Sequence, residues 1–105
     1  MKQKIYELKA DLLSALGHAN RLRILEFLKN GEQCNCDIYP ELDLEQSNLS
    51  RHMKILQEAG IVTARKKGLK VYYKVVDPRI YEIMDIVSEI VKTNLKRNLD
   101  LVSQL

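Results

Sequence analysis

The sequence predicts a mainly helical fold with one β-hairpin, and three observations support this prediction. Apolar residues recur at helical spacing over most of the chain. Residues 61–76 instead alternate apolar with polar side chains around Lys67-Gly68, which is typical of a hairpin. The length of 105 residues, with 46% hydrophobic and 30% charged residues, suits one modest core. We therefore expect residues 1–105 to form a single domain.

Two helices are predicted in the first third of the chain. The first covers residues 3–16 and ends at Gly17. Its apolar positions follow helical spacing: Ile5, Leu8, Leu12 and Leu16. Asn20 is a good N-cap for the second helix, which Asn30-Gly31 ends.

Two further helices are predicted in the middle of the chain. A short one covers residues 37–42, where Pro40 is tolerable because it would fall in the first turn. The next, over residues 46–59, is the clearest in the sequence. Leu49, Met53 and Leu56 share one of its faces, and polar residues cover the other.

The hairpin is followed by a long last helix. Strands are expected over residues 61–66 and 69–76, with one face packed and the other charged. Asp77-Pro78 then begins a helix with a long apolar stripe: Ile80, Met84, Val87, Val91 and Leu95, widened by Ile83, Ile90 and Val102. The stripe extends beyond the reach of one small core. We expect a homodimer through the first and last helices, the alternative being that these two helices pack together within one chain.

Positive charge is concentrated between Gln46 and Val76. Seven cations stand there against Glu58 alone, a net charge of +6, and the whole chain carries +3, so the remainder sums to −3. The cations are Arg51, Lys54, Arg65, Lys66, Lys67, Lys70 and Lys74. Such a concentration is the electrostatic pattern of a nucleic-acid binder, because phosphate neutralisation supplies most non-specific affinity. The alternative is an ordinary solvated basic surface.

The order of elements, four helices, a hairpin and a last helix, is that of a winged helix-turn-helix domain, with the fourth helix in the recognition position. Short polar side chains near the start of this helix suit base edges in the major groove. They are Gln46, Ser47, Asn48 and Ser50. Phosphate contacts are expected from Arg51 and Lys54 in the helix. Contacts with the adjacent DNA backbone or minor groove are expected from four hairpin residues: Arg65, Lys66, Lys67 and Lys70.

The two histidines have different predicted roles. His52 lies at about 300° when Leu49 is set to 0°, on the shoulder of the apolar face. It is a candidate DNA-binding residue, with a structural or phosphate-contact role favoured over base reading. His18 stands alone before the second helix and is expected to be a surface or capping residue.

Four motifs agree in order and spacing with one known family: Leu16-Gly17-His18-Ala19-Asn20-Arg21-Leu22-Arg23-Ile24-Leu25, Cys34-Asn35-Cys36-Asp37-Ile38, the helix from Gln46 to Leu56, and the basic hairpin ending Val71-Tyr72-Tyr73. Over residues 8–90 the chain resembles the ArsR/SmtB metalloregulators, and most resembles their arsenic-type branch with a Cys-x-Cys box. The resemblance implies a homodimeric repressor on an inverted-repeat operator in double-stranded DNA. The chain departs from the family pattern at Glu45, usually a serine or threonine cap, at Ser47, usually proline, and at Pro40.

The resemblance also implies that residues 33–38 are a metal-binding box with Cys34 and Cys36 as its thiolates. Residues two apart on a helix point about 200° apart, so both sulfurs reach one ion only if the backbone is unwound or extended. Binding would then distort the start of the third helix, which braces the recognition helix. Soft thiolates select arsenite, antimonite or a soft metal ion as a possible effector, whereas DNA binding requires no cofactor. The third ligand is left open: a small thiol, water, Asp37 or a histidine.

Roles of the two cysteines other than metal binding stay open. No apolar run approaches the ~20 residues of a membrane span and no signal peptide is evident, so we expect a cytoplasmic protein without a membrane partner. Both cysteines should then be reduced. Thiol oxidation or modification is an alternative signal, and absence of sensing is a third possibility.

Catalysis is not expected. A cysteine nucleophile needs a positioned base, and only His18 and His52 are present. There is no glycine-rich phosphate loop and no pair of carboxylates for acid and base chemistry. A winged helix used purely for protein docking is the remaining alternative, and it predicts no salt-dependent DNA affinity.

Overall fold

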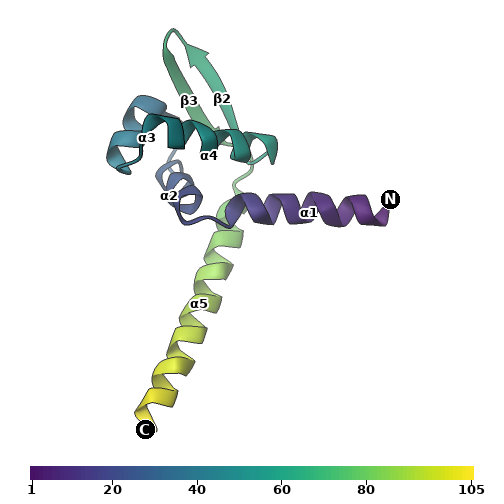
Figure 1. Cartoon of the computed structure of the whole chain (residues 1–105), viewed down its shortest axis with the longest axis vertical. Coiled ribbons are helices and arrows are strands. Elements are labelled where there is room, and N and C mark those ends of the chain that lie inside the picture. Colours follow the sequence, from purple (N-terminus) through teal and green to yellow (C-terminus); the bar gives the residue numbers. More distant parts are fainter.

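The computed structural model describes residues 1–105 and has a small body from which two helices extend (Figure 1). Its elements in chain order are α1 (Lys2–Leu16), α2 (Ala19–Phe27), β1 (Gln33–Cys34), α3 (Asn35–Glu41), α4 (Gln46–Glu58), β2 (Val62–Lys67), β3 (Lys70–Val75) and α5 (Arg79–Ser103). The predicted mainly helical fold with a hairpin is confirmed. The short strand β1 was not predicted, because two residues are too few to show an alternating pattern.

The three strands form one antiparallel sheet in the order β1-β3-β2. In the hairpin, Lys67 pairs with Lys70, so the two-residue turn is Gly68-Leu69, one residue later than predicted. Gly68 adopts a φ of 64°, a left-handed conformation that glycine accepts without a steric penalty. At the other edge, Cys34 of β1 pairs with Tyr72 of β3. The strand that carries the first cysteine is thus part of the same sheet as the hairpin.

The core lies where α2, α3 and α4 meet the base of the hairpin. The largest fully buried side chains are Ile24, Leu25, Ile38, Leu49, Met53, Leu56 and Ile61. The predicted apolar face of α4 is therefore the buried one. Tyr81 in the first turn of α5 adds a polar tie, since its hydroxyl donates to the Leu25 carbonyl at 2.6 Å.

Three helix starts differ in detail from the prediction. His18, rather than Asn20, caps α2: its Nδ1 accepts the Asn20 backbone N–H at 3.1 Å. Helix α3 begins at Asn35, so Pro40 lies beyond the first turn and its predicted placement is wrong. Helix α5 begins at Arg79, so Pro78 lies at the N-cap rather than at the first helical position as predicted, and the Asp77 carboxylate accepts the Arg79 backbone N–H at 3.0 Å. Arg79 also holds the pKa of Asp77 at about 2.

Helices α1 and α5 meet only near the body and then diverge (Figure 1). Large apolar side chains are exposed along both helices, including Ile5, Leu8 and Leu13 on α1 and Val87, Ile90, Val91 and Leu95 on α5. The two helices therefore do not cover each other's stripes within one chain. No helix combines the length and the apolar character that crossing a bilayer requires.

Candidate nucleic-acid interface

The polar face of α4 is turned outward. Burial of Leu49, Met53 and Leu56 fixes the rotation of the helix about its axis. The predicted base-reading residues Gln46, Ser47 and Ser50 are consequently exposed, and Asn48 is half-buried. Asn48 Oδ1 accepts a hydrogen bond from Nη2 of Arg51 at 3.1 Å, which orients both side chains. Lys54 is exposed on the same helix.

The turn between α3 and α4 sets where this face begins. Asp43 has a φ of 54°, in the left-handed region that aspartate tolerates better than most residues. The Leu44 backbone N–H then donates to the Tyr39 carbonyl at 2.8 Å. Glu45 occupies the N-cap position without a side-chain cap bond, and the helix still begins at Gln46 as predicted.

The hairpin β2–β3, which we call the wing, carries most of the remaining positive charge. Lys66, Lys67 and Lys70 are exposed, and Lys67 and Lys70 face each other across the turn. Like charges in register repel one another, so the wing tip gains from a nearby anion. The ion pairs of the structure, Arg65–Glu32, Arg79–Asp77 and Lys92–Glu89, involve none of these lysines.

Arg65 differs from the wing lysines because it already has a partner. Its Nε donates to Glu32 Oε2 at 2.9 Å and its Nη2 donates to Glu32 Oε1 at 2.7 Å. The guanidinium also lies 4.7 Å from the centre of the Tyr72 ring. The bond from Arg65 lowers the pKa of Glu32 below its ordinary value, and Glu32 raises the pKa of Arg65. Glu32 lies just before β1, so this pair ties the cysteine-bearing segment to the wing.

His52 lies on the core side of α4 and is only 4% exposed. Its Nδ1 is 3.2 Å from Nη1 of Arg21, and its ring centre is 4.5 Å from that of His18. Burial, and then the nearby His18, Arg21 and Arg51, lower the pKa of His52. Of its two predicted roles, this geometry favours the structural one.

Arg21 was not identified from the sequence, although it connects three helices. From α2 it donates through Nε to the Ala15 carbonyl at 2.6 Å and through Nη2 to the Ser14 carbonyl at 3.2 Å, both at the end of α1. Its position at helical spacing from Ile24 and Leu25 was an available signal, since it placed an arginine on the buried face.

The two cysteines converge at the start of α3. Cys34 is extended, with φ −76° and ψ 142°, whereas Cys36 is already helical, and their Cα atoms are 5.1 Å apart. The predicted need for an extended backbone is therefore met. The sulfurs are joined in a disulfide, so the expectation of two reduced thiols is wrong for this structure. A Cα separation within the usual disulfide range makes the bond geometrically accessible. Cys34 is buried and Cys36 is exposed.

The residues around the sulfurs do not complete a metal site. No group of three or more His, Cys, Asp or Glu side chains in the chain is arranged to hold a metal ion. Neither Asp37 nor a histidine joins Cys34 and Cys36, and a trigonal thiolate site needs a third donor. The donor set therefore does not fit a resident metal ion held by one chain.

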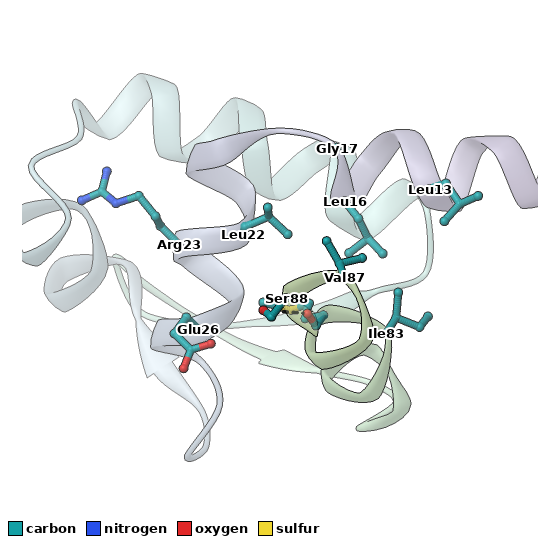
Figure 2. Close-up of a pocket in the computed structure, with 10 residues that line it drawn as sticks. Leu13, Leu16, Gly17, Leu22, Arg23, Glu26, Ile83, Val87 and Ser88 are labelled. Atoms are coloured by element: carbon teal, nitrogen blue, oxygen red, sulfur yellow. Dashed lines mark hydrogen bonds between the residues drawn. The ribbon is translucent and has the colours of Figure 1, made fainter. Parts of the chain in front are cut away.

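A separate apolar surface lies where α1, α2 and α5 meet. It contains an open cavity of about 480 Å³. In Figure 2, Leu13 and Leu16 of α1, Leu22 of α2, and Ile83 and Val87 of α5 surround this cavity. Arg23 and Glu26 lie at its margin. The cavity is continuous with the exposed apolar stripes of α1 and α5.

Comparisons with known proteins agree on one group. The family model described as "Bacterial regulatory protein, arsR family" matches residues 18–64, which hold α2, β1, α3, α4 and the start of the wing. An uncharacterised HTH-type transcriptional regulator of Methanocaldococcus jannaschii is 44% identical over 86 residues, 81% of this chain and 97% of that protein. The arsenical resistance operon repressor of Staphylococcus xylosus is 33% identical over 98 residues, 93% of this chain and 83% of that protein. A homodimeric winged helix-turn-helix domain of Mycobacterium bovis, a possible ArsR-family regulator, has a TM-score of 0.78 at 24% identity and covers 91% of this chain and 89% of its own.

Proposed function

Because this chain belongs to the ArsR family of bacterial regulatory proteins, we propose that it is a dimeric repressor that binds operator DNA through α4 and the wing. The observation that carries the proposal is the outward polar face of α4 beside a wing whose lysines have no acidic partner. Its relatives are transcriptional regulators, and the chain is not an enzyme, as the sequence predicted.

The two parts of this surface have different roles in the proposal. A helix fits the major groove, where short polar side chains distinguish base pairs. The base-edge contacts are Gln46, Ser47, Asn48 and Ser50. The phosphate contacts are Arg51 and Lys54 of α4 and Lys66, Lys67 and Lys70 of the wing. Arg65 contributes only through the N–H groups that its two hydrogen bonds to Glu32 leave free.

The dimer interface of the proposal is formed by α1 and α5. Val91 and Leu95 are 47% and 58% exposed, and isolated chains rarely leave a long apolar stripe uncovered. The stripes run into the cavity between α1, α2 and α5 (Figure 2), whose lining is mainly hydrophobic. In the proposed dimer, α1 of a second copy, on which Ile5 and Leu8 are exposed, covers this surface. A two-fold dimer would present two copies of α4 to the two halves of an inverted repeat.

The proposed signal acts on Cys34 and Cys36. Capture of arsenite, antimonite or a soft metal ion would use both thiolates and a third ligand from outside the chain. Oxidation to the disulfide is the second candidate, and the joined sulfurs together with the absent third donor favour it. In both cases the start of α3, where Cys34 caps the helix by accepting the Cys36 N–H, is the place that changes.

A fluorescence anisotropy titration on the DNA upstream of the gene tests both parts. The reduced protein is expected to bind, and Arg51→Ala and Lys67→Ala should weaken binding while the circular dichroism spectrum is unchanged. Arsenite, cadmium or the thiol oxidant diamide is then added in separate titrations. Release by one agent that disappears in Cys34→Ser and Cys36→Ser identifies the signal. Release that persists in both serine variants would exclude the cysteines as the sensor.

A further inference from the structure

The cysteine-bearing segment is bonded to the wing at both ends of β1. At its carboxyl end, Asn35 Oδ1 accepts the Val71 backbone N–H at 3.2 Å. This bond continues the β1–β3 ladder one residue beyond the Cys34–Tyr72 pair. At its amino end, Glu32 holds Arg65 of β2 through two hydrogen bonds. Two residues that have no role in the proposed DNA surface thus fix the strands that form it.

Both residues lie close to the sulfurs along the chain. Asn35 stands between the two cysteines, and its Oδ1 is 3.3 Å from Cys34 Sγ. Glu32 is separated from Cys34 only by Gln33. A change in the backbone of residues 34–36 therefore acts directly on Asn35, which bonds the wing. The path from the sulfurs to α4 is longer, because it passes through the packing of α3.

We propose that Glu32 and Asn35 are positioning residues that make the wing respond to the state of the Cys34–Cys36 pair. This inference rests on the proposed function, since it states how the cysteine signal reaches the DNA surface. It adds the wing as the responding element, in place of the start of the recognition helix alone.

The redox step in this scheme is balanced by an external dithiol. A dithiol reductant supplies two electrons and two protons, the Cys34–Cys36 bond breaks to give two thiols, and the reductant becomes a disulfide. Cys36 Sγ is then no longer held at Cys34, and the backbone between them can relax. Asn35 is the residue in between, so its bond to the Val71 N–H is the first contact with the wing to change.

The Glu32–Arg65 pair affects the net charge of the wing more than it affects the stability of the fold. The side chain of Arg65 is 56% exposed and that of Glu32 is 30% exposed, so solvent screens the pair. An exposed pair of this kind changes an equilibrium by at most about fivefold. The Glu32 carboxylate, however, cancels one positive charge on a surface that is proposed to bind phosphates. Movement of Glu32 away from Arg65 would return that charge to the wing.

Hydrogen exchange of the full-length chain, followed by NMR without DNA, tests the Asn35 contact. The Val71 amide is compared in the oxidised protein and in the protein reduced by dithiothreitol. In the wild type, its exchange rate should differ by about tenfold or more between the two states, as expected when a ladder bond opens. In Asn35→Ala it should exchange fast in both states. Equal Val71 exchange in the two states of the wild type, or a difference that survives in Asn35→Ala, would overturn the proposal.

The Glu32 contact is tested on DNA with a matched control. Glu32→Gln and Glu58→Gln each remove one negative charge, but Glu58 is exposed at the end of α4 and forms no ion pair. In the oxidised protein, where Glu32 is paired with Arg65, Glu32→Gln should steepen the salt dependence of DNA binding by about one unit of log–log slope per protomer, and Glu58→Gln should not. Equal slopes in the two variants would overturn the role of Glu32.

The two tests separate this inference from the function on which it rests. If the operator affinity of the wild type does not depend on the redox state while Val71 exchange does, redox sensing is excluded and the coupling of the cysteines to the wing is supported. If affinity responds while Val71 exchange is unchanged, the signal reaches DNA by another route and only the coupling fails.

Discussion

Nη1 of Arg21 lies 3.2 Å from Nδ1 of His52, inside the angle formed by α1, α2 and α4. Arginine is a permanent donor, so Nδ1 of His52 must accept, and the ring is neutral with its proton on Nε2. The same guanidinium holds two carbonyl groups at the end of α1. Through Arg21 and His52, helix α1 of the proposed dimer interface is attached to α4, the proposed recognition helix.

Replacement of Arg21 should be strongly destabilising. Arg21→Met keeps much of the side-chain volume but leaves the Ala15 carbonyl and the His52 ring without their partner. Each buried polar group left unsatisfied costs about 1–3 kcal/mol, so we expect a loss of about 2–4 kcal/mol in the free energy of unfolding. Urea denaturation measures it. Arg97→Met on the exposed part of α5 should change stability by less than about 0.5 kcal/mol, and similar losses in both variants would contradict the assignment.

The lowered pKa of His52 predicts that stability falls in mild acid. The ordinary pKa of histidine is 6.5, so below this pH His52 is protonated in the unfolded chain but stays neutral in the folded chain. The free energy of unfolding therefore decreases as pH falls through this region. Denaturation at about pH 7.5 and about pH 5.5 should show this decrease in the wild type. His52→Gln should have a flatter dependence. An unchanged slope in His52→Gln would contradict the buried, neutral histidine.

Tyr81 provides a comparable test at alkaline pH. Burial and then Glu26 raise the pKa of Tyr81 to about 12. The unfolded chain ionises near pH 10 and the folded chain does not, so stability should fall as pH rises above about 10. Burial raises the pKa of Tyr73 as well, so Tyr81→Phe should reduce this dependence rather than abolish it. It also removes the bond to the Leu25 carbonyl, at a cost of about 1 kcal/mol. Tyr6→Phe, at an exposed residue of α1, is the control and should leave both quantities unchanged.

Much of the proposed DNA-binding surface could be predicted from the sequence, because the residue spacings that indicate it are local. The spacing of Leu49, Met53 and Leu56 set the buried face of α4, and placed His52 on its shoulder. The Glu32–Arg65 and Arg21–Ala15 contacts could not be predicted, because they join residues that only the tertiary fold brings together. Strand β1 exists for the same reason: its two residues pair with β3, and they show no pattern of their own.

Loss of a base-edge contact and loss of a phosphate contact should have different effects on DNA affinity. Gln46→Ala is expected to cost about 1–3 kcal/mol on the operator and little on unrelated DNA, because it removes a contact that distinguishes bases. Lys67→Ala should weaken binding to both sequences alike and reduce the salt dependence by about one unit of slope. Anisotropy on an operator and a scrambled duplex measures both. A uniform loss from Gln46→Ala would remove it from the base-reading set.

The α5 stripe should hold the dimer together. Val91→Glu places a charge on the exposed apolar face, whereas Thr93→Glu places the same charge about 200° around the helix. Light scattering after gel filtration should give a dimer for the wild type and Thr93→Glu, and a monomer for Val91→Glu. A wild-type monomer at micromolar concentration, or a Val91→Glu dimer, would contradict the proposed interface.

The salt dependence of operator binding tests the central claim most directly. Five proposed phosphate contacts per protomer release counterions, so a plot of log affinity against log salt should fall with a slope steeper than about −4 between about 50 and 200 mM. A winged helix used only for protein docking has no such dependence. Steep, linear loss of affinity is the predicted result. Absence of binding at about 50 mM salt, or an affinity that salt leaves unchanged, would contradict the account of α4 and the wing as a DNA-binding surface.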